Sequence, residues 1–331
     1  MFCLLQMQQT PNKKWQNQTI TSEFILMGFG DLQSLQVPLF LFFLVIYLVT
    51  MAGNLLIFVL VVVDNHLHTP MYFFLGNLSF LETCYSANIL PKMLSDLLTE
   101  ERSISVKACF VQFHIISCLV GTECYLLAMM SYDRYLAICK PLHYWTLMNA
   151  RLSFQLAALS WISGILFSTS LIVKLSQMSF CGPNKIDHFF CDIVPDISDI
   201  SCSDTHFVEL QSFIYASVFT FPPFALTLSS YVFIIVTIIR IPSTSGRQKA
   251  FSTCSSHLIV VALYYGTLMV IYLLPHSRYW RHLRKEFSLP HTVLTPLLNP
   301  LIYSLRNKEV KEAMNRIFGK LSYFRKSAFK R

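Results

Sequence analysis

The sequence predicts an all-α membrane protein: a seven-transmembrane helix bundle followed by a short amphipathic C-terminal helix. Composition is the first indication, because 54% of the 331 residues are hydrophobic and only 13% are charged, whereas soluble domains carry about a quarter charged residues. The second is that the charges gather in short stretches between long apolar runs, as in chains that cross a membrane repeatedly. The runs do not alternate as the strands of a membrane barrel do. They therefore predict helices, because backbone amides inside lipid must be satisfied within the segment.

Seven stretches are long enough for the helices, since about 20 apolar residues cross the hydrocarbon core. Five of them contain no Asp, Glu, Lys or Arg, while the second contains only Glu82 and the third only Glu123. In chain order they are 32–63, 66–91, 108–132, 152–173, 210–239, 250–277 and 287–305. They divide the chain into an extracellular N-terminus (1–31), a seven-transmembrane domain (32–305) and a cytoplasmic helix and tail (306–331).

The basic residues predict the orientation of the chain in the plasma membrane. Fifteen of the 26 Lys and Arg lie on the side of the C-terminal tail, while six acids cluster between Asp187 and Glu209 on the other side. Basic residues mark the cytoplasmic side, so the N-terminus is predicted outside. A glycosylation sequon at Asn17 agrees. The apolar stretch after Met1 is too short for a signal peptide, so we expect the first helix to direct insertion, with Met7 as an alternative start.

Four cysteines are predicted on this oxidising outer side. Cys109 begins the third helix, and the other three lie in the long loop before the fifth. They predict two disulfides, but their spacing leaves all three pairings open. The four residues are Cys109, Cys181, Cys191 and Cys202.

Six motifs occur in order along the chain. They are Gly53-Asn54, PMYFFLGNLSFLE (70–82), MSYDRYLAICKPLHY (130–144), SY (230–231), KAFSTCSSHL (249–258) and PLLNPLIYSLRN (296–307). With them the chain resembles the olfactory (odorant) receptor family of rhodopsin-like G-protein-coupled receptors, over about residues 17–319. The resemblance implies a receptor and not an enzyme. It also implies a small volatile odorant as ligand, and a heterotrimeric G protein of the stimulatory, olfactory type that raises cAMP.

The resemblance further implies the disulfides Cys109–Cys191 and Cys181–Cys202, and an activation switch at the inner end of the third helix. An acid–base pair there lies at the headgroup boundary, where charge is tolerated, and on its own would be read as an interfacial anchor. In the family the acid neutralises the arginine until the sixth helix moves outward, and a proline kinks the seventh helix. The switch residues are Asp133, Arg134, Tyr135, Tyr231, Asn299, Pro300 and Tyr303.

Two acids lie at the depth of the hydrocarbon, where a charge costs about 2.5–3.5 kcal/mol on insertion scales. One alternative is a protonated carboxyl hydrogen-bonded to a serine. The resemblance implies an allosteric sodium ion or a proton, held by Asn54, Glu82 and Glu123 with Asn299 nearby. Glu82 stands where the family usually has Asp. We expect no other cofactor and no metal.

Helical spacing in the outer halves of the third, fifth and sixth spans predicts stripes of residues on one face. Taken alone, such stripes more often pack helices together, but on the family template they face a ligand cavity. We expect an apolar cavity with a few hydroxyls and no fixed charge, suited to small neutral volatiles; a carboxylic acid would require a buried cation. The predicted ligand residues are Phe113, Ile116, Ser117, Val120, Gly121, Tyr215, Phe219, Tyr265, Leu268, Met269, Tyr272 and Thr292.

The loop 174–209 is expected to cover this cavity, with its acids solvating a surface. These are Asp187, Asp192, Asp196, Asp199 and Asp204. The basic stretch 278–285 is expected to be an outer loop that pairs with them. Residues 307–321 are expected to form a basic amphipathic helix on the anionic inner leaflet, with Val310, Ala313 and Met314 on its apolar face.

Other classes of protein fit less well. The histidines form no HxxxH or HExxH pair and GxSxG is absent, so the sequence does not indicate a membrane enzyme. Basic residues do not gather in one patch, which argues against nucleic acid. No repeat relates the two halves as in many transporters. A receptor of the same family that acts outside olfactory tissue stays an open alternative.

Overall fold

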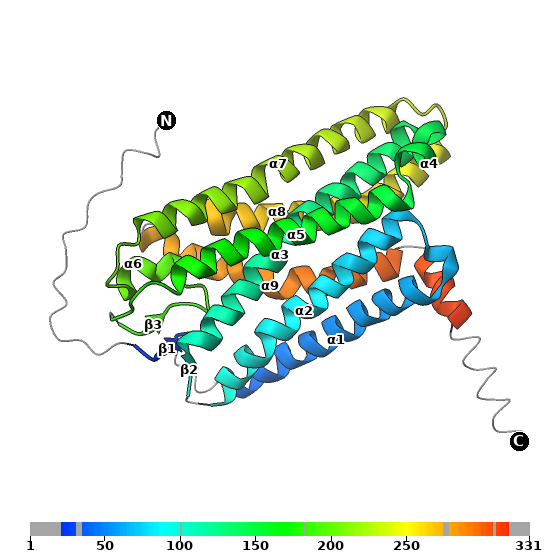
Figure 1. The fold of residues 1–331 in the computed structure, drawn as a ribbon. Coiled ribbons are helices and arrows are strands. Elements are labelled where there is room, and N and C mark those ends of the chain that lie inside the picture. Colours follow the sequence, from blue (N-terminus) through cyan, green and yellow to red (C-terminus); the bar gives the residue numbers. More distant parts are fainter. Residues whose placement is uncertain are drawn as a thin grey trace, which may run out of the picture.

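Seven long helices lie side by side in the computed structural model of the chain (Figure 1), and they confirm the predicted all-α seven-transmembrane class. The structure describes residues 21–30, 35–99, 101–181, 183–273, 278–306 and 309–317. The long helices are α1 (Gln36–Val63), α2 (Pro70–Leu98), α3 (Val106–Cys139), α5 (Ala150–Leu175), α7 (His206–Ile239), α8 (Thr244–Leu273) and α9 (Arg278–Arg306). Asn17, at which the sequon lies, is outside the described residues.

Short elements connect these helices. At the end of the bundle that is predicted to face the cytoplasm, called the inner end below, they are η1 (Asn65–Leu67), η2 (Pro141–His143) and α4 (Tyr144–Leu147). At the opposite end, called the outer end, they are β1 (Glu23–Leu26), β2 (Ser103–Ser105), β3 (Lys185–Ile186), η3 (Val194–Asp196) and α6 (Ile197–Ile200). A last helical segment occupies 309–317, within the predicted 307–321.

The surface of the bundle is apolar, as lipid requires. Among the described helices, α1, α3, α5 and α7 are long and apolar enough to cross a membrane by length and composition, and α8 contains a shorter apolar stretch, His257–Ile271. Leu41, Phe42 and Val45 of α1 are each more than half exposed. Exposed apolar surface of this extent marks a membrane-facing side. By contrast, α3 is buried over most of its length and packs against α2, α5, α7 and α8.

Local sequence explains where several helices begin. Pro70 stands in the first turn of α2, where its missing N–H costs nothing. The side chains of Ser105 and Asn149 accept hydrogen bonds from the backbone N–H groups of Ala108 and Leu152 and so cap α3 and α5. Several helices also extend beyond the ends of the apolar stretches that predicted them. For example, α3 continues through Arg134 to Cys139, because charge is tolerated at headgroup depth.

A three-stranded sheet in the order β2-β1-β3 covers part of the outer end of the bundle (Figure 1). β1 pairs antiparallel with β2, where Phe24 is opposite Ile104, and parallel with β3, where Leu26 is opposite Ile186. Phe24, Leu26 and Ile186 are fully buried and pack with Cys109 and Cys191. The sequence did not predict this sheet, because its strands are short and pair residues far apart in the chain.

The stretch 278–285 was predicted to be an outer loop, and this prediction is wrong. It forms the first two turns of α9, which continues to Arg306. The stretch contains no Gly or Pro, and its Arg, Leu and Lys residues are good helix formers. High charge was the reason for predicting a loop, but beyond the hydrocarbon core charge is compatible with a helix.

The helices α3 and α5 approach each other closely where α5 carries a glycine. A β-carbon at Gly164 would lie 2.6 Å from the carbonyl oxygen of Cys118 and 2.5 Å from the Oγ1 atom of Thr122, both on α3. The backbone oxygen cannot rotate away. A side chain at this position would therefore separate α3 from α5.

We predict that Gly164→Ala lowers the free energy of unfolding by about 1–3 kcal/mol, as overpacking does. The measurement is the thermal unfolding midpoint of the detergent-purified receptor. Gly266→Ala is the matched control, because nothing lies within 4 Å of a β-carbon at that position in α8. Equal midpoints for the two variants would contradict the close approach.

Candidate functional site

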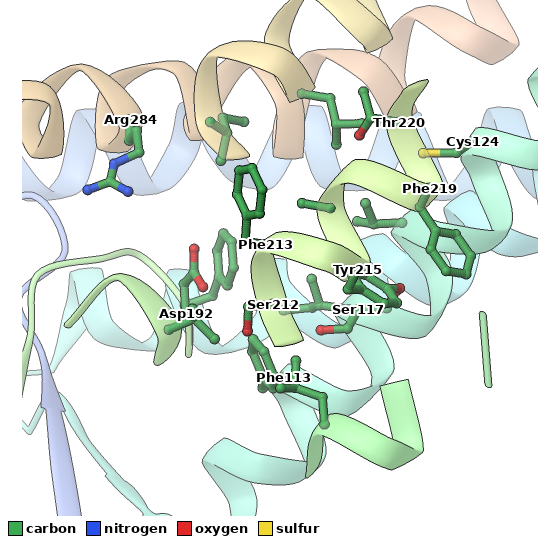
Figure 2. A pocket seen from close by; sticks show the side chains of 18 residues that line it. Phe113, Ser117, Cys124, Asp192, Ser212, Phe213, Tyr215, Phe219, Thr220 and Arg284 are labelled. Carbon is green, nitrogen blue, oxygen red and sulfur yellow. The ribbon is translucent and has the colours of Figure 1, made fainter. Parts of the chain in front are cut away.

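A mainly apolar cavity lies in the outer half of the bundle, between α3, α7 and α8 and beneath the loop that follows α5 (Figure 2). Its lining combines aliphatic and aromatic side chains with a few polar ones, which is the usual composition of a small-molecule site. The lining residues are Phe113, Ile116, Ser117, Val120, Cys124, Leu171, Phe190, Asp192, Val194, Ser212, Phe213, Tyr215, Ala216, Phe219, Thr220, Leu268, Ile271 and Arg284.

Only some of the residues that were predicted to bind the ligand line this cavity. Seven of the predicted residues line it: Phe113, Ile116, Ser117, Val120, Tyr215, Phe219 and Leu268. Gly121 lies behind the wall, because a β-carbon there would be 2.5 Å from the Tyr215 hydroxyl. Tyr265, Met269 and Thr292 are not among the lining residues, and the side chain of Tyr272 is outside the described part. A role of any of these residues in ligand binding stays a prediction.

The phenols around the cavity tie α7 and α8 to the backbone of α3. Tyr215 donates a hydrogen bond to the carbonyl oxygen of Ser117 at 2.5 Å and stacks on Phe219, with ring centroids 4.5 Å apart. Tyr264 and Tyr265 of α8 donate to the carbonyl oxygens of Val120 (2.9 Å) and Cys124 (2.7 Å). The hydroxyl of Tyr215 was expected to face the ligand, but its proton is used within the bundle.

The expectation of a cavity without fixed charge is wrong. Arg284 of α9 and Asp192 of the loop both line it, and they are only 5% and 4% exposed. Asp192 and Asp196 were expected to solvate a surface, yet both are buried. Burial, and next the charge of Asp196, raise the pKa of Asp192 to about 7, while Arg284 acts in the opposite direction.

The position of Arg284 was missed because 278–285 was assigned to a loop. If the predicted seventh helix had been extended toward its N-terminus, helical spacing would have placed Arg284 on its buried face. Arg284, Ser288, Thr295 and Asn299 share one face of α9, and all four are buried. Nothing in the sequence signals the burial of Asp192, which depends on contacts between distant segments.

Two disulfides and several polar contacts hold the loop over the cavity. Cys109 is joined to Cys191 and Cys181 to Cys202, the pairing that the family resemblance implied. The backbone N–H of Cys191 donates to the Oε1 atom of Gln112 at 2.9 Å. Lys285 forms an ion pair with Asp187, so one of the expected pairings between basic stretch and acids is present.

Deeper in the bundle, the two acids at hydrocarbon depth come together. Glu82 and Glu123 are 1% and 3% exposed, and their carboxyl groups lie close enough to interact. The amide of Asn299 donates to Glu82, and that of Asn54 donates to the carbonyl oxygen of Pro296 at 3.0 Å. These polar groups join α1, α2, α3 and α9 at one point.

Three of the predicted switch residues, Asp133, Arg134 and Tyr135, lie at the inner end of α3. Asp133 lies 3.7 Å from Arg134 and accepts a hydrogen bond from the hydroxyl of Tyr144 at 2.7 Å. Tyr144 was not predicted to take part, although it closes the motif 130–144. On α7, Tyr231 hydrogen-bonds the Nδ1 atom of His257 on α8 at 2.6 Å, a second contact that the sequence reading missed.

The remaining switch residues are placed less completely. The ring of Tyr135 packs against Phe233 of α7, with centroids 5.8 Å apart. Pro300 packs against α1, since a β-carbon at Gly53 would lie 2.9 Å from its Cβ atom. The side chain of Tyr303 lies outside the described part of α9.

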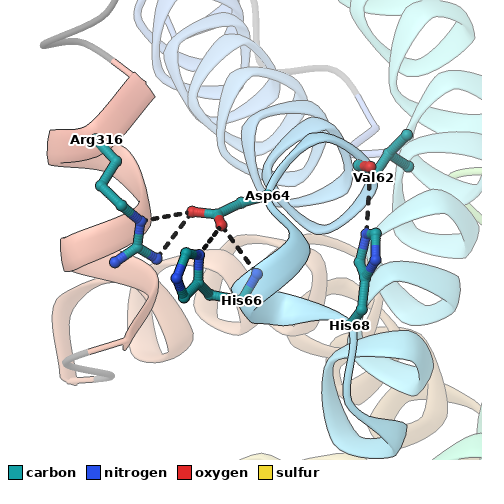
Figure 3. A network of polar contacts seen from close by, with 5 residues as sticks. All are labelled: Val62, Asp64, His66, His68 and Arg316. Atoms are coloured by element: carbon teal, nitrogen blue, oxygen red, sulfur yellow. Dashed lines mark hydrogen bonds and ion pairs between the residues drawn. The ribbon is translucent and has the colours of Figure 1, made fainter.

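The C-terminal helix docks on the first inner loop (Figure 3). Arg316 forms two contacts with Asp64, at 2.9 and 2.8 Å, and His66 bonds the other carboxylate oxygen. Burial alone would raise the pKa of Asp64, but the hydrogen bonds from His66 and Arg316 lower it to about 2. The apolar face of the helix is buried at Val310 and Ala313, as predicted, whereas Arg316 binds protein.

Comparison with known proteins gives one consistent result. The olfactory receptor family matches residues 43–320 of the chain. The chain is 47% identical to olfactory receptor 8U3 of Mus musculus over 304 residues, which cover 92% of this chain and 95% of the relative. It is 49% identical to human (Homo sapiens) olfactory receptor 10A7 over 301 residues (91% and 95%). It is 48% identical to human olfactory receptor 10A3 over 305 residues (92% and 97%).

Proposed function

Because the chain belongs to the olfactory receptor family, we propose that it binds small, neutral, mainly apolar volatiles in the outer cavity and activates a stimulatory G protein, which raises cAMP. The observation that carries the proposal is the cavity itself, whose wall of Phe113, Val120 and Leu268 is apolar and lies under a disulfide-held loop. A mostly apolar, enclosed cavity of this kind fits a small apolar ligand, most of whose surface is removed from water on binding. The protein is a multi-pass plasma membrane receptor, and we propose an extracellular N-terminus.

The contacts between α3 and α8 suggest how a ligand would act. Tyr264 and Tyr265 attach α8 to the backbone of α3 close to the cavity. Leu268 of α8 lines the cavity one turn further out. A ligand that pushes against Leu268 would strain these two hydrogen bonds, and α8 could then pivot about its outer end.

At the inner end, the same movement of α8 would break its contact with α7. The hydrogen bond between Tyr231 and His257 joins the two helices there. Arg134 lies close by on α3, paired with Asp133. Separation of α7 from α8 would open a site beside Arg134, and a helix of the G protein with free backbone carbonyls would accept hydrogen bonds from the guanidinium.

We expect a cAMP reporter in cells that express the receptor to rise in a dose-dependent manner with at least one member of a broad odorant panel. Arg134→Ala is expected to lose most of this response, because the alanine cannot bind the G protein. Surface expression, measured on an N-terminal tag, has to be equal for both receptors. An undiminished response of Arg134→Ala would refute the role of the arginine.

We also propose that the acids at hydrocarbon depth bind a sodium ion or a proton. Within the described residues, Asn54 Oδ1, Glu82 Oε2, Glu123 Oε1 and Asn299 Oδ1 are buried and make no hydrogen bond. Buried polar atoms without partners often mark a water or ion site, and hard cations prefer oxygen ligands. The donor set of two carboxyls and two amides fits such an ion.

Replacement of Glu82 or Glu123 by Gln is expected to abolish the dependence of basal cAMP signalling on sodium, because each change removes a carboxylate ligand. The measurement compares basal cAMP in sodium and in choline medium. Glu101→Gln, which removes an exposed outer acid, should keep the wild-type dependence. If the buried variants keep it as well, the ion does not bind at this pair.

A further inference from the structure

The two ends of the cavity differ in chemistry (Figure 2). Cys124, Phe219 and Thr220 surround one end, which lies deep in the bundle. Asp192 and Arg284 lie at the opposite end, beneath the outer loop, and both are at least nine-tenths buried. A ligand in the cavity therefore has an apolar surrounding along its body and a charged surrounding at one tip.

A third polar group lies near this charged end. Ser212 of α7 lines the cavity next to Asp192 (Figure 2). Its Oγ atom is buried and, among the described residues, has no hydrogen-bond partner. A buried hydroxyl without a partner is unfavourable, so a ligand that hydrogen-bonds Ser212 gains affinity over one that does not.

The charges at this end discriminate between classes of polar group. A carboxylate ligand would approach Arg284 but would also meet Asp192, next to which Asp196 adds a second buried acid close enough to affect it. A protonated amine would meet the guanidinium. A neutral oxygen that only accepts hydrogen bonds is attracted by Arg284 and Ser212. Because this oxygen carries no net charge, Asp192 does not repel it as it would repel a carboxylate.

Within the receptor role proposed above, we propose that this cavity selects volatiles with an apolar body and one carbonyl oxygen, as in ketones, aldehydes and esters, and that Arg284 binds that oxygen, while Ser212 offers a second donor on the other side of Asp192. Arg284 then determines ligand specificity through a charge-assisted hydrogen bond. Such a bond contributes at least about tenfold in affinity over a ligand that lacks the acceptor. In its ionised form, Asp192 repels anions and compensates the buried charge of Arg284.

The test compares ligands that share one carbon skeleton, chosen from a skeleton to which the wild-type receptor responds in the cAMP assay. The series contains the ketone or aldehyde, the alcohol, the carboxylic acid, the amine and the hydrocarbon. For the wild type we expect the carbonyl compound to be the most potent, at least about tenfold above the hydrocarbon and the acid. A carboxylic acid or an amine as the most potent member would overturn the proposal.

The variants separate specificity from folding. Arg284→Met alone would leave Asp192 buried without its compensating charge, which destabilises, so the main variant is Arg284→Met combined with Asp192→Asn. We expect it to lose the tenfold preference for the carbonyl while its response to the hydrocarbon stays within about threefold. Arg284→Lys retains a donor and should retain part of the preference, and Ser212→Ala should reduce it.

Thr220→Val, at the deep end of the cavity, is the matched control, because it removes a hydroxyl far from the charged end. For this variant, the potency of every ligand in the series is expected to change by a similar factor, so that the order of potency among the ligands stays the same. If the double variant also shifts all ligands alike, Arg284 only supports the loop and the inference fails, while the receptor role stands. If no odorant acts on wild-type receptor at the cell surface, the receptor role fails, and the inference with it.

Discussion

Lipid offers no hydrogen bonds, and the rest of the structure depends on this constraint. A polar group at membrane depth is costly unless it finds a partner inside the bundle. Glu82 meets Glu123 and Asn299, and Asn54 bonds the backbone of α9. The same requirement directs the phenols of Tyr264 and Tyr265 to carbonyl oxygens of α3. Polar residues therefore join the helices to one another, while the apolar side chains of α1 face outward.

Because α3 takes part in most of these contacts, it connects the two ends of the receptor. Its outer half supplies Ile116 and Val120 to the cavity, and Cys109 ties its first turn to the loop above. Its inner end carries Asp133 and Arg134. In the proposed mechanism, the buried α3 is the surface against which α7 and α8 move, so that a ligand at one end would change contacts at the other.

Much of this could be predicted from sequence because it depends on local pattern. Run length indicated the seven helices. Helical spacing put Phe113, Tyr215 and Leu268 on single faces of their helices, and the family resemblance implied that these faces line one cavity, as they do. What could not be predicted depends on contacts between distant segments, such as the pairing of β1 with β2 and β3. The burial of Asp192 is of the same kind. The error at Arg284 had a different cause: charge was taken as evidence of a loop, although a helix can carry charge beyond the hydrocarbon.

The central claim is that seven helices cross the membrane, so that the cavity faces outward and Arg134 faces the cytoplasm. Epitope tags at the two chain ends test this claim most directly, by antibody staining of intact and of permeabilised cells. Seven crossings predict staining of the N-terminal tag on intact cells and of the C-terminal tag only after permeabilisation. Detection of both tags on the same face would contradict the count of crossings and the mechanism built on it.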